Sequence, residues 1–272
     1  MSKRVWRNKA RFCAAVLLLV ASMRPGPALA WGRIGHRVAA RMAEDRLTPA
    51  ARDAVHAILG PGVSLADAST WADGQREIEE SYRWHFVNVP ISADRYDSRY
   101  CSPKSCVVNK IEDFRRILQN SQAGRPQKQQ ALKFLIHLIA DLHQPLHVGD
   151  NNDQGGNLLQ VRFFGVGSNL HRLWDSQVME RHTKNEKVWL WDFDFVANPK
   201  MVSEWSKGTP ADWATESLHI AREAYRVPGS DKWMRSGARL GNDYYRFALP
   251  VIRAQLAKAG IRIAFVLNAI SR

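Results

Sequence analysis

The sequence has few cysteines, no long apolar run and no glycosylation signal. Only three of its 272 residues are cysteine, so the two Cys pairs of a cysteine-rich metal site are missing. The apolar stretch over residues 12–23 is too short to span a bilayer comfortably. Asn-x-Ser/Thr is absent, which favours the bacterial periplasm as the destination of an exported chain. Neither a Gly/Ser linker nor an internal repeat occurs, so residues 31–272 are expected to form one domain.

The first 30 residues have the pattern of an export signal. A basic segment precedes the apolar stretch, and Ala28-Leu29-Ala30 has the small-x-small form that signal peptidase cuts. We therefore predict a cleaved signal peptide over residues 1–30, a periplasmic or secreted location, and no stable membrane association after cleavage. The segment carries six basic and no acidic residues, so its removal lowers the formal charge from +13 to +7. A basic mature chain is consistent with a polyanionic substrate but does not require one.

Two cysteines remain in the mature chain, with four residues between them in the segment YCSPKSC. In an exported protein, Cys101 and Cys106 predict a disulfide that closes a small loop. A metal site is the alternative, and the lack of a second Cys pair disfavours it.

The segment FLIHLIADLHQPLH, residues 134–147, places histidines and an aspartate among apolar residues. His137 and Asp141 are four positions apart, and on an α-helix this spacing puts both side chains on nearly the same face. Pro145 is expected to end or kink the helix, which lets His147 approach the same cavity from the next segment. His143 is interpreted as a core histidine with a hydrogen-bond partner, not as a ligand.

A second pair with the same spacing, His171 and Asp175, follows in the segment NLHRLWDS. Burying unpaired imidazoles and carboxylates costs several kcal/mol for each group, a cost that a metal ion or close pairing offsets. Two such pairs within 39 residues therefore favour a metal site over buried polar residues without one.

Three further acceptors lie upstream, at His36, Asp73 and His85. Each alone is typical of a helix cap or a surface residue. With the residues above they make a set of five histidines and three aspartates, which suits catalytic Zn²⁺ better than a closed structural site. If cleavage follows Ala30, the α-amino nitrogen and carbonyl oxygen of Trp31 can chelate a metal, with His36 as a third ligand.

Apolar spacing and turn signals predict a mostly helical chain with a minor β-hairpin. Residues 158–164 are expected to form one strand of the hairpin, and residues 84–90 a short extended run. Helices are expected over residues 32–47, from Thr48-Pro49 to about Leu59, from Ser64 through Trp71 and Asp73, over 107–119, through His137, from His171, from Thr209-Pro210 to about Tyr225, from Ser230 with a kink at Pro250, and over 261–270.

Six short motifs, taken in order, resemble the S1/P1 nuclease family. Trp31 with GxxGH, then WADxxR, WHF, HxxxDxxQPLH, GGN and HxxxWD cover essentially the whole mature chain. The family shares a mostly helical trinuclear-zinc fold with bacterial zinc phospholipases C. The resemblance therefore implies a single-domain helical phospholipase C/P1 nuclease-like fold that holds three zinc ions.

Carried over residue by residue, the resemblance divides the ligands among three ions. The first is held by Asp73, His85, His137 and Asp141, the second by His147, His171 and Asp175, and the third by Trp31, His36 and the other oxygen of Asp141. Asp141 thus bridges two ions. His143 matches no ligand position.

The motifs also contain residues suited to binding a nucleotide. The resemblance implies that Asp73, Arg76 and Asp141 are catalytic. Arg76 is expected to bind the phosphate through its planar guanidinium group; the alternative is that it is an ordinary surface arginine. Phe86 is expected to stack on a base, a contact worth ~1–3 kcal/mol.

Two asparagines and a glycine complete this substrate-binding set. Asn157 is expected to contact the base edge after the close backbone turn at Gly155-Gly156, although turn formation alone explains it as well. Asn88 stands where some fungal members have an aspartate that contacts the base, so their base preference does not carry over. The single Cys pair and the missing sequon also differ from eukaryotic members and resemble bacterial ones.

The resemblance implies a monomeric phosphodiesterase that hydrolyses single-stranded RNA and DNA to 5′-phosphorylated products and also acts on 3′-nucleotides. Two alternatives stay open. One is a zinc phospholipase C that cleaves lipid headgroup esters, and the other is a periplasmic zinc-binding protein without catalysis. The WADxxR, GGN and His85-Phe86 features favour a nucleotide over a lipid. Arg76 and the stacking residue are unexplained if the protein only stores zinc.

Overall fold

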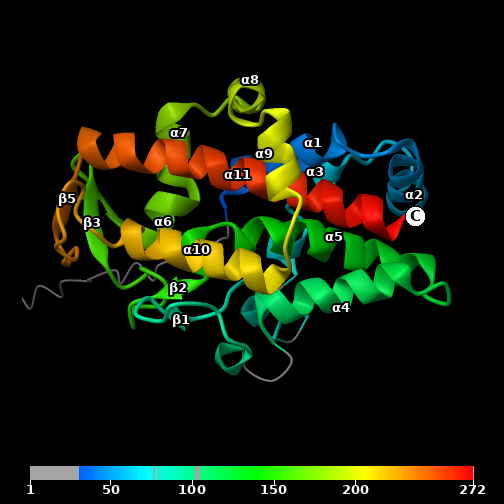
Figure 1. Cartoon of the computed structure of the whole chain (residues 1–272), viewed down its shortest axis with the longest axis horizontal. Helices are drawn as coiled ribbons and strands as arrows, with labels where there is room; N and C mark the ends of the chain where they lie inside the picture. The colour runs from blue at the N-terminus through cyan, green and yellow to red at the C-terminus, as the bar shows by residue number, and fades with distance from the viewer. Residues whose placement is uncertain (1–30, 76, 79, 102–104, 272) are drawn as a thin grey trace, which may run out of the picture.

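The computed structural model describes residues 31–75, 77–78, 80–101 and 105–271. The expected signal peptide, residues 1–30, lies outside the described residues. A central helix, α5 (Arg125–Leu142), packs against α1 (Arg33–Glu44), α4 (Val107–Gln119), α10 (Pro210–Ala224) and α11 (Asn242–Ile270). Figure 1 shows α11 running along the length of the molecule, with α10, α5 and α4 arranged below it. The prediction of a mostly helical chain is confirmed.

The N-terminal helices begin largely where their capping signals predict. Helix α1 lies within the expected range, and α2 (Pro49–Leu59) begins after Thr48, whose hydroxyl oxygen accepts the N–H of Ala51 at 3.2 Å. The helix expected from Ser64 through Trp71 is wrong. It ends after one turn as α3 (Leu65–Ala68), and a separate 3-10 turn, η1 (Ala72–Gly74), carries Asp73.

The early end of α3 has a local cause. The hydroxyl of Ser69 donates to the carbonyl oxygen of Ala66 at 2.8 Å, and such side-chain bonds compete with continuation of the helix.

Helices α4 and α5 pack against each other. The bounds of α4 match the expected range, and the predicted disulfide between Cys101 and Cys106 precedes it. The rings of Phe114 and Phe134 stack at 4.9 Å between the two helices. Helix α5 ends at Leu142. After a short turn, the chain forms the 3-10 helix η4 (Pro145–His147).

Two small sheets accompany the helices. The predicted hairpin is confirmed as β3 (Gln160–Phe163) and β4 (Val166–Asn169), and β5 (Ala238–Leu240) joins β3 in parallel. Strand β1 (Val89–Pro90) pairs in parallel with β2 (Gly149–Asp150).

The extended run expected over residues 84–90 is correct only at its end. Trp84 and His85 belong to the 3-10 helix η2 (Ser81–His85). The ring of Trp84 packs against Phe134 at 5.1 Å and Phe114 at 5.8 Å. This packing outweighs the strand preference of aromatic residues. A further 3-10 turn, η3 (Ser98–Tyr100), precedes the disulfide.

The C-terminal half departs most from the sequence predictions. Helix α10 begins with a capping box between Thr209 and Asp212, as its signals predict. The long helix expected from Ser230 begins only at Asn242, because residues 226–240 form a bridge and strand β5. It then continues as one helix through Pro250 to Ile270, so no separate helix begins at Ile261.

Three other helical segments complete the chain. The helix expected at His171 is confirmed as α6 (Leu170–Arg172), which continues through a π-helix, η5 (Leu173–Gln177), into α7 (Val178–His182). Helices α8 (Glu186–Val196) and α9 (Pro199–Trp205) were not predicted. In the described part of the chain, no helix has both the length and the apolarity that crossing a bilayer requires.

Candidate metal centre

The first two candidate ligands lie one turn apart on the buried half of α5. His137 and Asp141 are fully buried, because the helix is enclosed by other helices on every side there. Nε2 of His137 lies 3.2 Å from Oδ2 of Asp141. The four-residue spacing therefore brings both side chains into one place.

The two oxygens of Asp141 face different imidazoles. Oδ2 lies 2.8 Å from Nδ1 of His85, which reaches the site from the end of η2. Oδ1 lies 3.3 Å from Nε2 of His36 on α1. The rings of His36 and His137 stack at 3.9 Å, and Asp73 lies 3.5 Å from His137 Nε2. A carboxylate with this arrangement can contact two cations at once.

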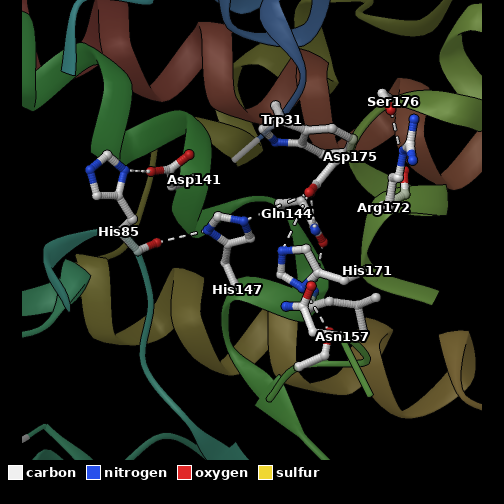
Figure 2. A network of polar contacts seen from close by, with 12 residues as sticks. Trp31, His85, Asp141, Gln144, His147, Asn157, His171, Arg172, Asp175 and Ser176 are labelled. Atoms are coloured by element: carbon white, nitrogen blue, oxygen red, sulfur yellow. Dashed lines mark hydrogen bonds and ion pairs between the residues drawn. The ribbon is translucent and has the colours of Figure 1, made fainter. Parts of the chain in front are cut away.

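A second group forms where η4 meets the π-helix η5. His147 lies on η4, His171 on α6 and Asp175 on η5. Oδ1 of Asp175 is 3.8 Å from Nε2 of His147, and Oδ2 is 3.4 Å from Nε2 of His171. Figure 2 shows this group converging, with His85 and Asp141 to one side. The wider turn of a π-helix often occurs at functional sites.

Backbone carbonyl groups fix the orientation of three imidazoles. Nδ1–H of His137 donates to the carbonyl oxygen of Ser69 at 2.7 Å. His147 donates in the same way to His85 at 2.8 Å, and His171 to Gly155 at 2.7 Å. In the neutral form of each ring, this bond leaves Nε2 as the atom that can bind a metal. Such bonds are typical of metal-binding histidines.

Several of the atoms that face inward lack hydrogen-bond partners although they are buried. They are both ring nitrogens of His36, Oδ1 of Asp141, and Nε2 of His147 and His171; the 3.3 Å contact between His36 Nε2 and Asp141 Oδ1 is an ion-pair distance without hydrogen-bond geometry. An unpaired buried polar atom costs ~1–3 kcal/mol, so this concentration needs a compensating partner. Imidazole nitrogen and carboxylate oxygen are the donors that Zn²⁺ binds. The residues present therefore fit a zinc centre.

Among the residues that the structure describes, three groups have ligand atoms within 4.8 Å of one another: His36, Asp73 and His137; His85, His137 and Asp141; and His147, His171 and Asp175. The last group has the membership expected for the second zinc ion. The other two groups share His137. The resemblance assigns His36 to the third ion, but the structure places it beside Asp73 and His137, which were expected to hold the first ion.

Trp31 lies directly against these groups. Its indole N–H donates to the carbonyl oxygen of Ala140 at 2.9 Å, and the N–H of Gly32 donates to the carbonyl oxygen of Asp175 at 2.7 Å. These two bonds tie the chain at Trp31 to both ligand-bearing elements, and Figure 2 shows Trp31 beside Asp175.

Burial and charge shift the pKa values in the two groups differently. Burial lowers the pKa of His147, and burial together with the neighbouring His147 lowers that of His171 to about 3. Burial also raises the pKa of Asp175 well above its ordinary value. Burial opposes the charge of Asp141 as well, but its imidazole neighbours, His137 first, hold its pKa well below the ordinary value. Neutral imidazole is the form that binds a metal.

His143 points away from this centre, in agreement with its interpretation as a core residue. Its Nδ1–H donates to the carbonyl oxygen of Ile139 at 2.7 Å, and its Nε2 accepts from the guanidinium of Arg262 at 2.8 Å. Burial and the adjacent Arg262 lower the pKa of His143 to about 3. Both ring nitrogens are therefore occupied.

The centre opens into a cavity of about 760 Å³. Four candidate ligands line it, namely Asp73, His85, His147 and His171. The substrate-binding candidates Phe86, Asn88 and Asn157 line it as well. Arg76 lies outside the described residues.

Gly155 and Gly156 precede Asn157 in the sequence and have φ angles of 61° and 83°. A Cβ at Gly155 would collide with the carbonyl oxygen of Leu146. The carbonyl oxygen of Gly155 also holds His171, so this turn positions a ligand.

Two residues of the site were not singled out from the sequence. Gln144, within the QPLH motif, donates to Oδ1 of Asp175 at 2.6 Å and is fully buried. The sequence signal that could have identified Gln144 is its place between the helix that carries His137 and Asp141 and the proline that follows it. Tyr82, three residues before His85, lines the cavity, and its only sequence signal was its position two residues before the WHF motif.

Residues 31–272 match the family model described as S1/P1 Nuclease. The chain is 30% identical to "Endonuclease 4" of Arabidopsis thaliana, over 93% of this chain and 93% of that protein. It is 27% identical to "Nuclease S1" of Aspergillus oryzae, over 89% and 92%. It is 28% identical to "Nuclease P1" of Penicillium citrinum, over 88% and 97%. The solved structure of "Alpha Toxin from Clostridium Absonum" aligns with a TM-score of 0.42 and 17% identity, covering 90% of this chain and 66% of the toxin.

Proposed function

The chain belongs to the S1/P1 nuclease family, and we propose that this hydrolytic nuclease cleaves single-stranded RNA and DNA to 5′-phosphorylated products and removes 3′-phosphates from nucleotides. One observation carries the proposal. The lining of the cavity includes imidazole and carboxylate groups suited to metal, and Phe86 lines the same cavity. A phosphodiester at these groups therefore places a neighbouring base against an aromatic ring.

The proposed cofactor is three zinc ions. The groups around Asp141 and the group of His147, His171 and Asp175 support this number. Bound zinc acts as a Lewis acid on phosphoryl oxygens and lowers the pKa of water to about 7. The protein's own part is to orient the imidazole rings through the backbone bonds described above, and to hold Asp141 charged between two sets of imidazoles.

The walls of the cavity supply positioning. Phe86 offers a stacking surface that accepts any base. The side-chain amide of Asn157 donates to the carbonyl oxygen of Gln154 at 2.9 Å, which leaves its Oδ1 to accept from a base edge. Asn88 is exposed at the rim and can both donate and accept. The WADxxR motif assigns Arg76 to the phosphate.

The depth of the centre supports a preference for single strands. His147 and His171 are 3% and 5% exposed, so only an unpaired, splayed nucleotide brings its phosphate close to them. Extruding a paired base costs a few kcal/mol, which disfavours duplex substrates. Export is part of the proposal too, and the family match beginning at Trp31 agrees with removal of residues 1–30.

Hydrolysis assays on protein that begins at Trp31 test the proposal. We expect cleavage of single-stranded DNA and RNA with 5′-phosphate ends, much slower cleavage of a duplex of the same sequence, and release of phosphate from 3′-AMP. A chelator should abolish all three activities, and Zn²⁺ should restore them. Activity on phosphatidylcholine alone would identify a phospholipase instead, and zinc binding without any hydrolysis would identify a storage protein.

A further inference from the structure

We propose that Tyr82 and Arg83 form a second nucleotide subsite, next to the one at Phe86, which binds the neighbouring base and phosphate of a single strand. The inference rests on the proposed function and extends it, because it makes the protein select oligonucleotides over mononucleotides. The short helix η2 carries both residues, and His85 at its end belongs to the metal centre. The subsite is therefore anchored to the same element as a ligand.

The exposure of Tyr82 is the first observation. Its exposed fraction is 61%, whereas the other five tyrosines of the chain are buried or half-buried. Tyr82 lines the cavity and meets Phe86 edge to face, with ring centres 5.4 Å apart and an angle of 70° between the planes. An exposed aromatic ring loses little entropy on contact and offers a flat surface, as stacking on a base requires.

The angle between the rings determines what can bind. Because the two rings are in contact, no base fits between them, so each ring offers a separate free face. Two bases stacked on faces inclined by 70° cannot stay stacked on each other. Consecutive nucleotides must therefore be splayed apart, which a flexible single strand permits and a duplex resists.

Arg83 supplies the charge for a phosphate. It is exposed, lines the cavity, and makes no ion pair with any carboxylate of the described residues. Arg37 and Arg99, in contrast, are both paired with carboxylates. A free guanidinium beside an exposed ring matches the alternation of phosphate and base along a strand.

The cavity extends beyond the metal ligands. Its volume of about 760 Å³ is in the upper part of the ~300–1,000 Å³ range of pockets for single small ligands. It extends from the metal ligands past Phe86 to Tyr82, Arg83 and Tyr100. The second subsite is thus continuous with the first.

The decisive measurement is the ratio of kcat/KM for a short oligodeoxyadenylate to kcat/KM for 3′-AMP. Stacking is worth ~1–3 kcal/mol per base, so Tyr82→Ala should lower this ratio about fivefold to 150-fold. Tyr82→Phe keeps the aromatic ring, so its ratio should stay close to that of the parent protein. A purely structural role would lower both activities together and leave the ratio unchanged, which would overturn the proposal.

Binding of a labelled phosphorothioate oligonucleotide, followed by fluorescence anisotropy, separates this subsite from the nuclease activity. Arg83→Gln should weaken binding and reduce the slope of log K against log salt by about 0.7, the value for one phosphate of a single strand. Trp233→Ala is the matched control, because Trp233 is 45% exposed but does not line the cavity.

The outcomes are distinct. Binding that depends on Tyr82 in a protein without hydrolytic activity would refute the proposed function and keep the subsite. Hydrolysis with binding unaffected by Tyr82→Ala and Arg83→Gln would refute the subsite and keep the function.

Discussion

The side-chain amide of Gln144 donates a hydrogen bond to Oδ1 of Asp175 at 2.6 Å, and this contact joins the end of α5 to the π-helix η5 (Figure 2). The orientation of the amide is fixed, because its oxygen accepts the backbone N–H of Leu146 at 2.7 Å. Gln144 therefore holds one oxygen of Asp175 in place while the other faces His171. Residues that support a ligand in this way tune its metal affinity.

Gln144→Ala should weaken zinc binding at the group of His147, His171 and Asp175. Loss of such a supporting bond typically costs 10–100-fold in metal affinity or activity, so we expect an effect of about that size. Competition with a chromophoric chelator measures the affinity directly. Gln255→Ala is the matched control, since this buried glutamine donates to the carbonyl oxygen of His143 and touches no candidate ligand. Equal affinities of the two variants would contradict the role of Gln144.

The sequence predicted those parts of the site that depend on local spacing. His137 and Asp141 lie on one helix, so a four-residue interval sufficed to place them together. The contact between Gln144 and Asp175 spans 31 positions and depends on where a π-helix follows a loop, which no local pattern specifies. The proximity of His36 to His137 also arises from packing between α1 and α5.

The same distinction explains the fold. Helices α2 and α10 begin at Thr-Pro caps that act within four residues. The start of α11 at Asn242 instead depends on the pairing of β5 with β3, a contact between segments that are distant in the chain. Local signals therefore predicted the starts of α2 and α10, and failed where tertiary contacts decide between helix and strand.

Asp141→Asn should remove zinc from more than one position, because each oxygen of Asp141 faces a different set of imidazoles. An amide is neutral and offers a single oxygen, so it cannot replace the carboxylate in both contacts. We expect loss of two zinc ions per chain by metal analysis, and turnover reduced by more than the ~100-fold typical of supporting residues. Asp113→Asn, on the solvated face of α4, should change neither quantity. Full zinc content in Asp141→Asn would rule out the bridging role.

The ion pair between Glu216 and Arg262 should make the stability of the folded protein fall in acid. Its carboxylate holds the almost fully buried Arg262 through bonds of 2.7 and 3.0 Å. Burial opposes the charge, but Arg262 and Lys258 lower the pKa of Glu216 to about 2, from an ordinary value of 4.5. A lowered pKa stabilises the folded protein fully above pH 4.5, and this contribution disappears as the pH falls toward 2.

Glu216→Gln should therefore destabilise the protein at neutral pH, at the lower end of ~1–3 kcal/mol because the side chain is 38% exposed. The difference from the parent in urea unfolding should shrink steadily below about pH 4.5. Glu112→Gln, whose partner Arg115 is 41% exposed, should have little effect at any pH. A Glu216→Gln difference that stays constant down to pH 3 would show that its charge does not contribute.

The free amino group of Trp31 is the one proposed ligand that depends on processing. The bonds from the Trp31 indole to Ala140 and from Gly32 to Asp175 hold this backbone against the centre whether or not a residue precedes it. Adding one Met before Trp31 converts the amine into an amide, which has no lone pair for a metal, while leaving those two bonds available. We expect protein that begins at Trp31 to hold three zinc ions and the extended form to hold two, or the third at least tenfold more weakly. Metal analysis after dialysis against a weak chelator measures this, and urea unfolding of the metal-free forms should show equal stability. If both forms retain three zinc ions with the same affinity, the amino terminus is not a ligand.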